Sequence, residues 1–414
     1  MQTAPPGWLP GARREPEALI REARRRQRRR WLAAGTALLM VAAGAAATVI
    51  AGSGAGRRPR PPGRPVTGTV RPAPSAMSGV RMPAGSSVRL LLTGPRPAWF
   101  SLATGHAEPI KGLPRDRWGY LFTRVVGGWS AQPGTAGPAC GAMCPGPPVL
   151  NYFIADGSPR AARIAAGYEV AASDGSGAVW LITFQRSGAD ISTTPALAQE
   201  VTTAGRPLGP RYRLPAGYLI RRAVGGDLLL GPVVEAPQEV VMYKLWDPVT
   251  RRVVRTFGDV IAAGPQAVAW GPICVHCPVR VLNLVTGTNA TIPLPGRAWA
   301  APNQGTFSPD GRYLAFPLWA GTAPDGEPAL THIAVIDTRD RRLLVVPGST
   351  ISGDVTKGVL SFGWQPRGHR LIAVLPGSGE TIQVASWQPG QARLWVATTQ
   401  IPPGTSAVVG EYGC

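Results

Sequence analysis

The chain has 414 residues, with 43 Lys and Arg against 23 Asp and Glu, so its formal net charge is +20. Gly (52 residues) and Pro (44 residues) make up nearly a quarter of the chain, and 44% of the residues are hydrophobic. This composition excludes a wholly disordered protein and argues against an all-helical one, because it requires frequent turns.

The excess positive charge lies mostly in the N-terminal part of the chain. Residues 1–52 contain nine Arg and three acidic residues, residues 53–87 contain six Arg and no acidic residue, and residues 88–414 keep a net charge of +8. A nucleic-acid-binding domain would gather Lys and Arg into a stripe, with aromatic side chains interleaved for stacking. No such stripe is visible after residue 87, so we expect no nucleic-acid partner.

Residues 31–52 form an apolar segment without a charge, WLAAGTALLMVAAGAAATVIAG. A helix of this length would cross a hydrocarbon core of about 30 Å. The Arg-rich residues before it predict a cytoplasmic N-terminus by the positive-inside rule. We therefore expect a single-pass protein of the cell membrane with a basic cytoplasmic tail (1–30), a signal anchor (31–52), a disordered Pro/Arg-rich tether (53–87) and an extracytoplasmic domain (88–414). The alternative is a cleaved signal peptide, because Val49, Ile50 and Ala51 have the small-residue spacing that signal peptidases accept.

The sequence after residue 87 is typical of all-β structure. Short runs of Val, Leu, Ile, Phe, Tyr and Trp alternate with Gly, Pro, Asp and Asn, which mark turns between strands. Three patterns recur: residues 155–159 and 166–168 match 203–207 and 216–218, residues 307–316 match 364–373, and a strand, a polar turn and a strand recur at 244–250, 281–287 and 335–340. Internal repeats of this size indicate a repeat architecture such as a propeller.

The run TFSPDGRYLAF at residues 306–316, followed by HIAVIDTRDRRLLVV at 332–346, resembles the WD40-like (PD40) repeat of TolB-type β-propellers. In that family the Ser-Pro-Asp-Gly turn joins two strands of a blade, which implies a structural role for Asp310. Pro309 and Gly311 fit a turn on their own chemistry, since Pro fixes φ and Gly accepts a positive φ. The resemblance covers residues 88–414, and we expect the anchor and tether in place of the TolB N-terminal domain.

Seven apolar runs are predicted to be the second strands of blades: residues 88–92, 120–126, 179–184, 228–234, 267–273, 313–319 and 371–375. The average of about 47 residues per blade lies within the range of propeller repeats. We predict an all-β fold, a propeller of about seven four-stranded blades preceded by one transmembrane helix, with six or eight blades as alternatives. Residues 406–412 are expected to supply the first strand of the first blade and so close the ring.

The five cysteines are Cys140, Cys144, Cys274, Cys277 and Cys414. In an oxidising compartment we expect two local disulfides, Cys140–Cys144 and Cys274–Cys277, with metal binding and free thiols as alternatives. One shared zinc ion is disfavoured because the two pairs fall in the second and fifth blades, on far sides of the ring. A redox-active dithiol is also disfavoured, since no helix is predicted after Cys277 to lower a thiol pKa.

No catalytic constellation is recognisable, since HExxH, G-x-S-x-G and Walker motifs are absent from the sequence. We therefore predict no metal and no cofactor, and we leave enzymatic activity undecided. Several loop residues are candidates for the mouth of the ring: Asp116, Asp174, Asp190, Asp259, Asp354, Trp118, Trp129 and Trp299. The alternative is that the aspartates cap turns or are solvated, and that the tryptophans are partly buried in the fold. His106, His276, His332 and His369 are isolated in the sequence and are expected in loops or on the surface.

The sequence favours a binding function. We expect a membrane-anchored module that binds or scaffolds an envelope protein or a polysaccharide, and the alternative is a propeller hydrolase or lyase that acts on cell-wall glycans. The membrane itself is the other expected partner. The sequence does not indicate whether the protein is a monomer or an oligomer.

Overall fold

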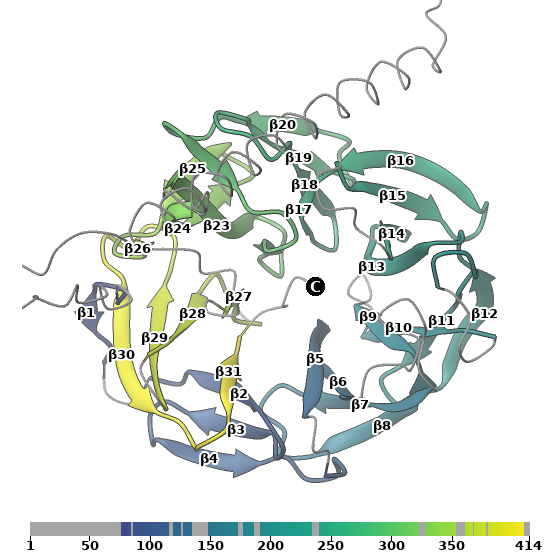
Figure 1. Ribbon diagram of the computed structural model, residues 1–414, viewed down its shortest axis with the longest axis horizontal. Coiled ribbons are helices and arrows are strands. Elements are labelled where there is room, and N and C mark those ends of the chain that lie inside the picture. Colours follow the sequence, from purple (N-terminus) through teal and green to yellow (C-terminus); the bar gives the residue numbers. More distant parts are fainter. Residues whose placement is uncertain are drawn as a thin grey trace, which may run out of the picture. The chain divides into compact units, whose positions relative to one another are not determined.

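A computed structural model describes residues 76–83, 86–115, 119–125, 127–134, 148–172, 177–185, 191–233, 240–322, 328–352, 361–366, 368–377 and 380–409. Over these residues the strands form seven blades around a common centre (Figure 1). No helix long and apolar enough to span a membrane occurs among them, and the segment expected to be the anchor, residues 31–52, lies outside this part of the chain.

The blades are numbered in chain order, each from its innermost to its outermost strand. Blade 1 is β31 (Ser406–Val408), β2 (Arg89–Thr93), β3 (Ala98–Ser101) and β4 (His106–Pro109). Blade 2 is β5 (Tyr120–Val125), β6 (Gly128–Pro133), β7 (Val149–Ala155) and β8 (Ala161–Gly167). Blade 3 is β9 (Glu169–Ala172), β10 (Ala178–Thr183), β11 (Leu197–Thr202) and β12 (Pro207–Arg213). Blade 4 is β13 (Tyr218–Val224), β14 (Asp227–Pro232), β15 (Met242–Asp247) and β16 (Arg252–Gly258).

Blade 5 is β17 (Val260–Ala263), β18 (Ala267–Trp270), β19 (Val279–Asn283) and β20 (Asn289–Ile292). Blade 6 is β21 (Ala298–Ala300) and β22 (Thr306–Phe307), which both pair with β23 (Tyr313–Thr322), followed by β24 (Pro328–Asp337) and β25 (Arg342–Val345); β26 (Ile351–Ser352) also pairs with β24. Blade 7 is β27 (Ser361–Trp364), β28 (Leu371–Pro376), β29 (Thr381–Trp387) and β30 (Trp395–Gln400), with β1 (Val80–Arg81) added outside β30. The prediction of an all-β propeller with seven four-stranded blades is confirmed for the described residues.

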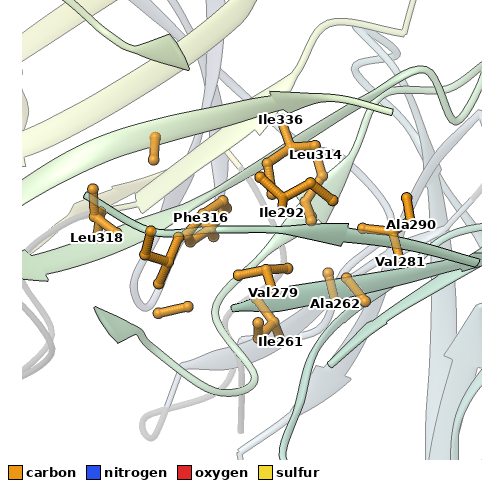
Figure 2. Packing of buried hydrophobic residues seen from close by; sticks show 14 of the residues in the cluster. Ile261, Ala262, Val279, Val281, Ala290, Ile292, Leu314, Phe316, Leu318 and Ile336 are labelled. Atoms are coloured by element: carbon orange, nitrogen blue, oxygen red, sulfur yellow. The ribbon is translucent and has the colours of Figure 1, made fainter. Parts of the chain in front are cut away.

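Buried apolar clusters hold neighbouring blades together, one at each of the seven junctions in the described structure. Figure 2 shows the cluster between blades 5 and 6, in which Leu314 and Phe316 of β23 pack against Ile261 and Val279. The alternate residues of β23, Tyr313 among them, belong to the cluster between blades 6 and 7. Because a second strand is buried on both faces, it reads in the sequence as an unbroken apolar run.

Six of the seven runs predicted as second strands hold that position. The exception is the run at residues 120–126, since residues 120–125 form β5, the first strand of blade 2. The second strand is β6, which begins with Gly128 and has a weak apolar signal. A Cβ atom on Gly128 would lie 2.2 Å from the carbonyl oxygen of Ile154, so the close approach of β7 requires a glycine where a larger residue would have marked the strand.

The C-terminal strand closes the ring as predicted. In blade 1, β31 pairs antiparallel with β2, and its partners are Ala407 with Leu92 and Val408 with Leu91. Figure 1 shows yellow β31 beside blue β2, from opposite ends of the sequence. Val408 is buried between blades 1 and 2. This pairing covers an edge that an open array of blades would leave exposed.

The start of the described chain is attached to the outside of blade 7. Val80 of β1 pairs in parallel with Trp395 of β30. The side-chain amide of Gln383 accepts a hydrogen bond from the backbone N–H of Met77 (2.7 Å) and donates one to its carbonyl oxygen (2.8 Å). Met77 and Met82 are buried on opposite sides of blade 7. These residues were expected in the tether, so the propeller begins before the boundary expected at residue 88.

Candidate functional site

The connections between strands differ at the two edges of the ring. In an antiparallel blade, first-to-second and third-to-fourth turns lie at one edge, and second-to-third connections lie at the other. The first edge has short connections such as residues 225–226, 264–266 and 248–251, whereas the second has longer ones such as 184–196 and 271–278. We call these the short-turn face and the long-loop face. Long loops on a rigid scaffold commonly carry binding residues.

A group of aromatic and charged side chains lies at the long-loop ends of blades 3 and 4. We call it the tyrosine–glutamate cluster, and its members are Tyr168, Glu169, Phe184, Tyr218, Arg221 and Lys244. Glu169 begins β9 and Tyr218 begins β13, the innermost strands of the two blades. The two strands touch through a parallel pairing of Ala172 with Arg222. Adjacent first strands therefore bring the cluster together.

Packing against a shared core fixes the rings of this cluster. Tyr168, Phe184 and Tyr218 all pack on the apolar cluster between blades 3 and 4 and remain partly exposed. The rings of Tyr168 and Phe184 meet edge to face, with centroids 5.0 Å apart. The Lys244 ammonium lies 3.8 Å from the centroid of the Tyr218 ring, a cation–π contact. Each ring thus presents part of its surface to solvent in a fixed orientation.

The charged members of the cluster influence one another. Burial raises the pKa of Glu169 above its ordinary value, and the positive charge of Arg221 opposes this effect. Burial and the negative charge of Glu169 raise the pKa of Tyr168. Arg221 lies at a bulge in β13, and its Nη2 donates a hydrogen bond to the carbonyl oxygen of Pro232 (3.1 Å). The site therefore combines aromatic faces with a carboxyl group that can accept or donate hydrogen bonds and a cation beside it.

The Cys274–Cys277 disulfide is present, as predicted, in the connection between β18 and β19 on the long-loop face. It closes an exposed turn in which His276 has φ 65°. Cys140, Cys144 and Cys414 lie outside the described residues. Among the residues that the structure describes, no group of three or more His, Cys, Asp and Glu side chains is placed to hold a metal ion.

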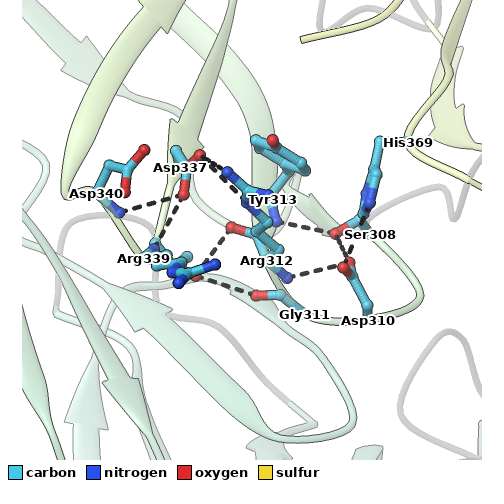
Figure 3. Close-up of polar contacts among 10 residues, drawn as sticks. Ser308, Asp310, Gly311, Arg312, Tyr313, Asp337, Arg339, Asp340 and His369 are labelled. Carbon is cyan, nitrogen blue, oxygen red and sulfur yellow. Dashed lines mark hydrogen bonds and ion pairs between the residues drawn. The ribbon is translucent and has the colours of Figure 1, made fainter.

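Pro309, Asp310 and Gly311 lie in the turn between β22 and β23, on the short-turn face (Figure 3). Oδ1 of Asp310 accepts hydrogen bonds from the Ser308 hydroxyl (2.7 Å) and from the backbone N–H of Arg312 (3.2 Å). Gly311 has φ 72°. His369, from the equivalent turn of blade 7, places Nε2 3.5 Å from Oδ2 of Asp310. Asp310 thus organises its own turn and lies beside His369 of the next blade, away from the tyrosine–glutamate cluster.

Most other candidates from the sequence have structural roles or lie outside the described part. Asp259 is buried, has φ 42° and accepts a hydrogen bond from the backbone N–H of Val241 (3.1 Å). Burial raises its pKa. Trp129 is buried between blades 1 and 2, and Trp299 lies in β21 with its ring edge to face on Trp319 (5.9 Å). Asp116, Asp174, Asp190, Asp354 and Trp118 are outside the described residues.

The four histidines are dispersed over the fold. His106 begins β4 and is exposed, and His276 lies in the disulfide turn. His332 of β24 contacts the Thr350 hydroxyl through Nδ1 (3.0 Å), and burial lowers its pKa. His369 lies in the turn of blade 7 described above. None of these imidazoles belongs to the tyrosine–glutamate cluster.

The residues of the tyrosine–glutamate cluster were not singled out from the sequence, although one signal pointed to them. The repeated Ala-Gly-Tyr motif ends at Tyr168 in one copy and at Tyr218 in the other. In the structure both copies stand where an innermost strand begins. Glu169 and Arg221 follow these tyrosines closely, but no repeat marks them, because a charged residue in a strand gives no sign of which neighbour it faces.

The sequence matches no protein-family model and no curated protein. Solved structures with a similar fold include TolB from Acinetobacter baumannii, with 10% identity, a TM-score of 0.39 and coverage of 76% of this chain and 77% of that one. A periplasmic gluconolactonase from Pseudomonas aeruginosa has 12% identity, a TM-score of 0.44 and coverage of 78% and 99%. A lignostilbene dioxygenase from Pseudomonas brassicacearum has 9% identity, a TM-score of 0.45 and coverage of 81% and 95%. Likenesses this weak carry no argument about function, which has to be inferred from the site.

Proposed function

We propose that the chain is a membrane-anchored, extracytoplasmic propeller that binds or scaffolds an envelope protein or a polysaccharide at its long-loop face. The tyrosine–glutamate cluster is the observation that carries this proposal. Partly exposed aromatic rings offer flat apolar contact area, and Glu169 and Arg221 offer charged hydrogen-bonding partners. Ligand sites are typically lined by apolar and aromatic side chains with a small number of polar groups among them.

The anchor is the part of the proposal that comes from residues 1–52. Nine Arg in these residues and the uncharged segment 31–52 support a single crossing with the N-terminus in the cytoplasm. N-terminal sequencing of the mature protein checks this. A chain that begins at Met1 agrees with the anchor, and one that begins at Gly52 or Ser53 would mean that the segment is a cleaved signal peptide.

The binding function is tested with the full chain as bait. The chain is cross-linked to a preparation of envelope proteins, and its affinity for isolated envelope polysaccharides is measured. We expect one specific ligand and about a tenfold loss of affinity in Glu169→Gln, because the amide cannot carry the negative charge that strengthens a hydrogen bond to the ligand. The control is Glu108→Gln, which changes an exposed residue of β4 in blade 1. Equal affinity of the two variants would place the ligand elsewhere.

A glycan hydrolase or lyase is the second candidate, and the raised pKa of Glu169 favours it. A carboxyl group with a raised pKa keeps its proton to a higher pH than an ordinary one, which suits a general acid. Glycoside hydrolysis also requires a second carboxyl group about 5–10 Å away, whereas the charge that acts on Glu169 is that of Arg221. Turnover of a glycan panel by the wild-type chain, lost in Glu169→Gln, would reverse the ranking of the two functions.

A further inference from the structure

Three neighbouring blades carry the same third-to-fourth turn on the short-turn face. In blades 4, 5 and 6 the side-chain Oδ1 atoms of Asp247, Asn283 and Asp337 each accept hydrogen bonds from two backbone N–H groups of the turn that follows. The six distances lie between 2.8 and 3.3 Å. These hydrogen bonds fix the backbone of each turn, so the residues at its tip are held in an ordered conformation.

The tips of two of these turns carry exposed apolar side chains. Val249 in blade 4 and Val285 in blade 5 follow Asp247 and Asn283 at the same spacing, and they are 79% and 68% exposed. Val249 is the most exposed large hydrophobic side chain among the described residues, and Leu121 of β5, at 67%, is exposed to the same extent as Val285. An aliphatic side chain that stays in water buries no apolar surface and therefore adds no hydrophobic stabilisation to the isolated domain. The arrangement therefore suits a partner that receives the tips.

Arginines flank these tips. Arg251 and Arg252 follow Val249, and the turn of blade 6 carries Arg341 and Arg342 at the corresponding positions, all exposed. The acidic residue exposed on this turn is Asp340. The Asp337 carboxylate is buried and pairs with Arg312 at 2.9 Å. The outward surface of the three turns is therefore cationic around apolar tips.

Two of these arginines occupy a backbone conformation that costs free energy. Arg251 has φ 58° and Arg341 has φ 55°, and the corresponding residue of blade 5 is Gly287, with φ 67°. A non-glycine residue in this left-handed region costs about 1–2 kcal/mol. Residues that persist in such conformations are often kept for function.

We propose that these three turns dock the propeller onto an anionic phospholipid bilayer. Aliphatic tips that enter the headgroup region and arginines that pair with lipid phosphates are the features of interfacial membrane binding. Charge complementarity selects this occupant, because the exposed arginines beside the apolar tips match the negative charge of lipid phosphates. The inference rests on the anchored protein of the proposed function, and it leaves the long-loop face for the ligand.

The test uses the full chain reconstituted into phosphatidylcholine vesicles with or without phosphatidylglycerol. A photoreactive phenylalanine analogue replaces Val249, Val285 or, as the control, Val240, which is 60% exposed beside the long-loop end of β15. We expect cross-links to lipid from positions 249 and 285 in the anionic vesicles, several-fold fewer in the neutral ones, and background levels from position 240. Cross-links to a second copy of the chain, or equal labelling at all three positions, would overturn the proposal.

The charge requirement is tested in the same vesicles. The quadruple variant with Gln at positions 251, 252, 341 and 342 should lose most of the cross-link at position 285, about fivefold or more. The control is the variant with Gln in place of four exposed arginines on the long-loop side: Arg96, Arg115, Arg280 and Arg297. Circular dichroism melts establish that both variants fold. A quadruple variant that cross-links as well as its control would show that the arginines do not dock the face.

The same experiment separates the docking surface from the anchor. A chain that floats with neutral vesicles but gives no lipid cross-link at Val249 has its anchor and lacks the docking surface. A chain that floats only with anionic vesicles, and loses flotation in the quadruple arginine variant, docks without an anchor. Flotation without cross-links contradicts the inference, and docking without an anchor contradicts the proposed function.

Discussion

Arg251 holds a backbone conformation that glycine adopts more easily, and the chain supplies its own comparison in Gly287. We expect Arg251→Gly to raise the free energy of unfolding by about 0.5 kcal/mol, because the cost of positive φ exceeds the entropy that glycine adds to the unfolded chain. Gly287→Ala should lower it by about 1 kcal/mol. Urea unfolding measures both. A loss of stability in Arg251→Gly would mean that the Arg251 side chain stabilises the fold.

The buried carboxylate of Asp337 makes stability depend on pH. Burial acts to raise its pKa, but hydrogen bonds from Arg312 and from the backbone N–H groups of Asp340 and Arg339, with the charge of Arg312, outweigh burial and leave the pKa below its ordinary value. A carboxyl group with a lowered pKa stabilises the fold above its unfolded pKa of about 4, and this contribution is lost as the pH falls through the folded pKa.

We therefore expect Asp337→Asn to lower the free energy of unfolding by about 1–2 kcal/mol at neutral pH, and the difference from wild type to shrink as the pH falls from 5 towards 2. Urea unfolding at a series of pH values measures this. The control is Asp340→Asn, which changes an exposed residue of the same turn. A difference that stayed constant over this pH range would mean that Asp337 acts through its shape and not through its charge.

At the level of single elements, β31 joins the two ends of the propeller with three residues. Truncation after Thr405 removes the pairing of Ala407 and Val408 with β2 and uncovers the junctions on both sides of blade 1. We expect a soluble yield far below wild type and a broad thermal transition, because an open propeller exposes an unpaired strand edge. Truncation after Gly410 keeps β31 and is the control. A sharp wild-type melt after loss of residues 406–414 would contradict closure by β31.

The side chain of Gln383 helps to hold the first described residues on the propeller. Gln383 makes two hydrogen bonds to the backbone of Met77, so Gln383→Ala should loosen β1 while the rest of blade 7 stays folded. Arg81 is exposed on β1, and trypsin should cut after it several-fold faster in the variant, since cleavage requires local opening. Gln400→Ala, at the end of β30, is the control. Equal rates of cleavage would mean that Gln383 does not hold β1.

The second strands could be predicted from the sequence because burial on both faces leaves a plain apolar run. The turn repeats were visible for a related reason, since the residues that form a turn are neighbours in the chain and their chemistry is local. The extent of the propeller before residue 88 was hidden, because Met77 and Gln383 are far apart in sequence and no local pattern joins them. The tyrosine–glutamate cluster was hidden for the same reason, since Glu169 and Arg221 lie on different blades.

For the molecule as a whole, the two faces of the ring divide the proposed work. The long-loop face carries the tyrosine–glutamate cluster, and the short-turn face carries Val249, Val285 and their arginines. Such a division requires a rigid ring. In a flexible ring, a ligand on one face and a bilayer on the other would each displace only the blades that they contact. The closure by β31 and the apolar cluster at each junction of the described structure argue for that rigidity.

Rigidity of the ring predicts that damage to one junction destabilises all blades together. Phe316 is fully buried between blades 5 and 6, and Phe316→Ala should lower the free energy of unfolding by about 3–5 kcal/mol. Trp fluorescence and far-ultraviolet circular dichroism should report the same shifted midpoint in urea, because a closed ring cannot lose one junction and keep the others. The control is Leu208→Ala, which changes a half-exposed residue of β12 and should leave the midpoint unchanged. Separate midpoints for the two signals in Phe316→Ala would mean that the blades unfold independently, as in an open repeat array.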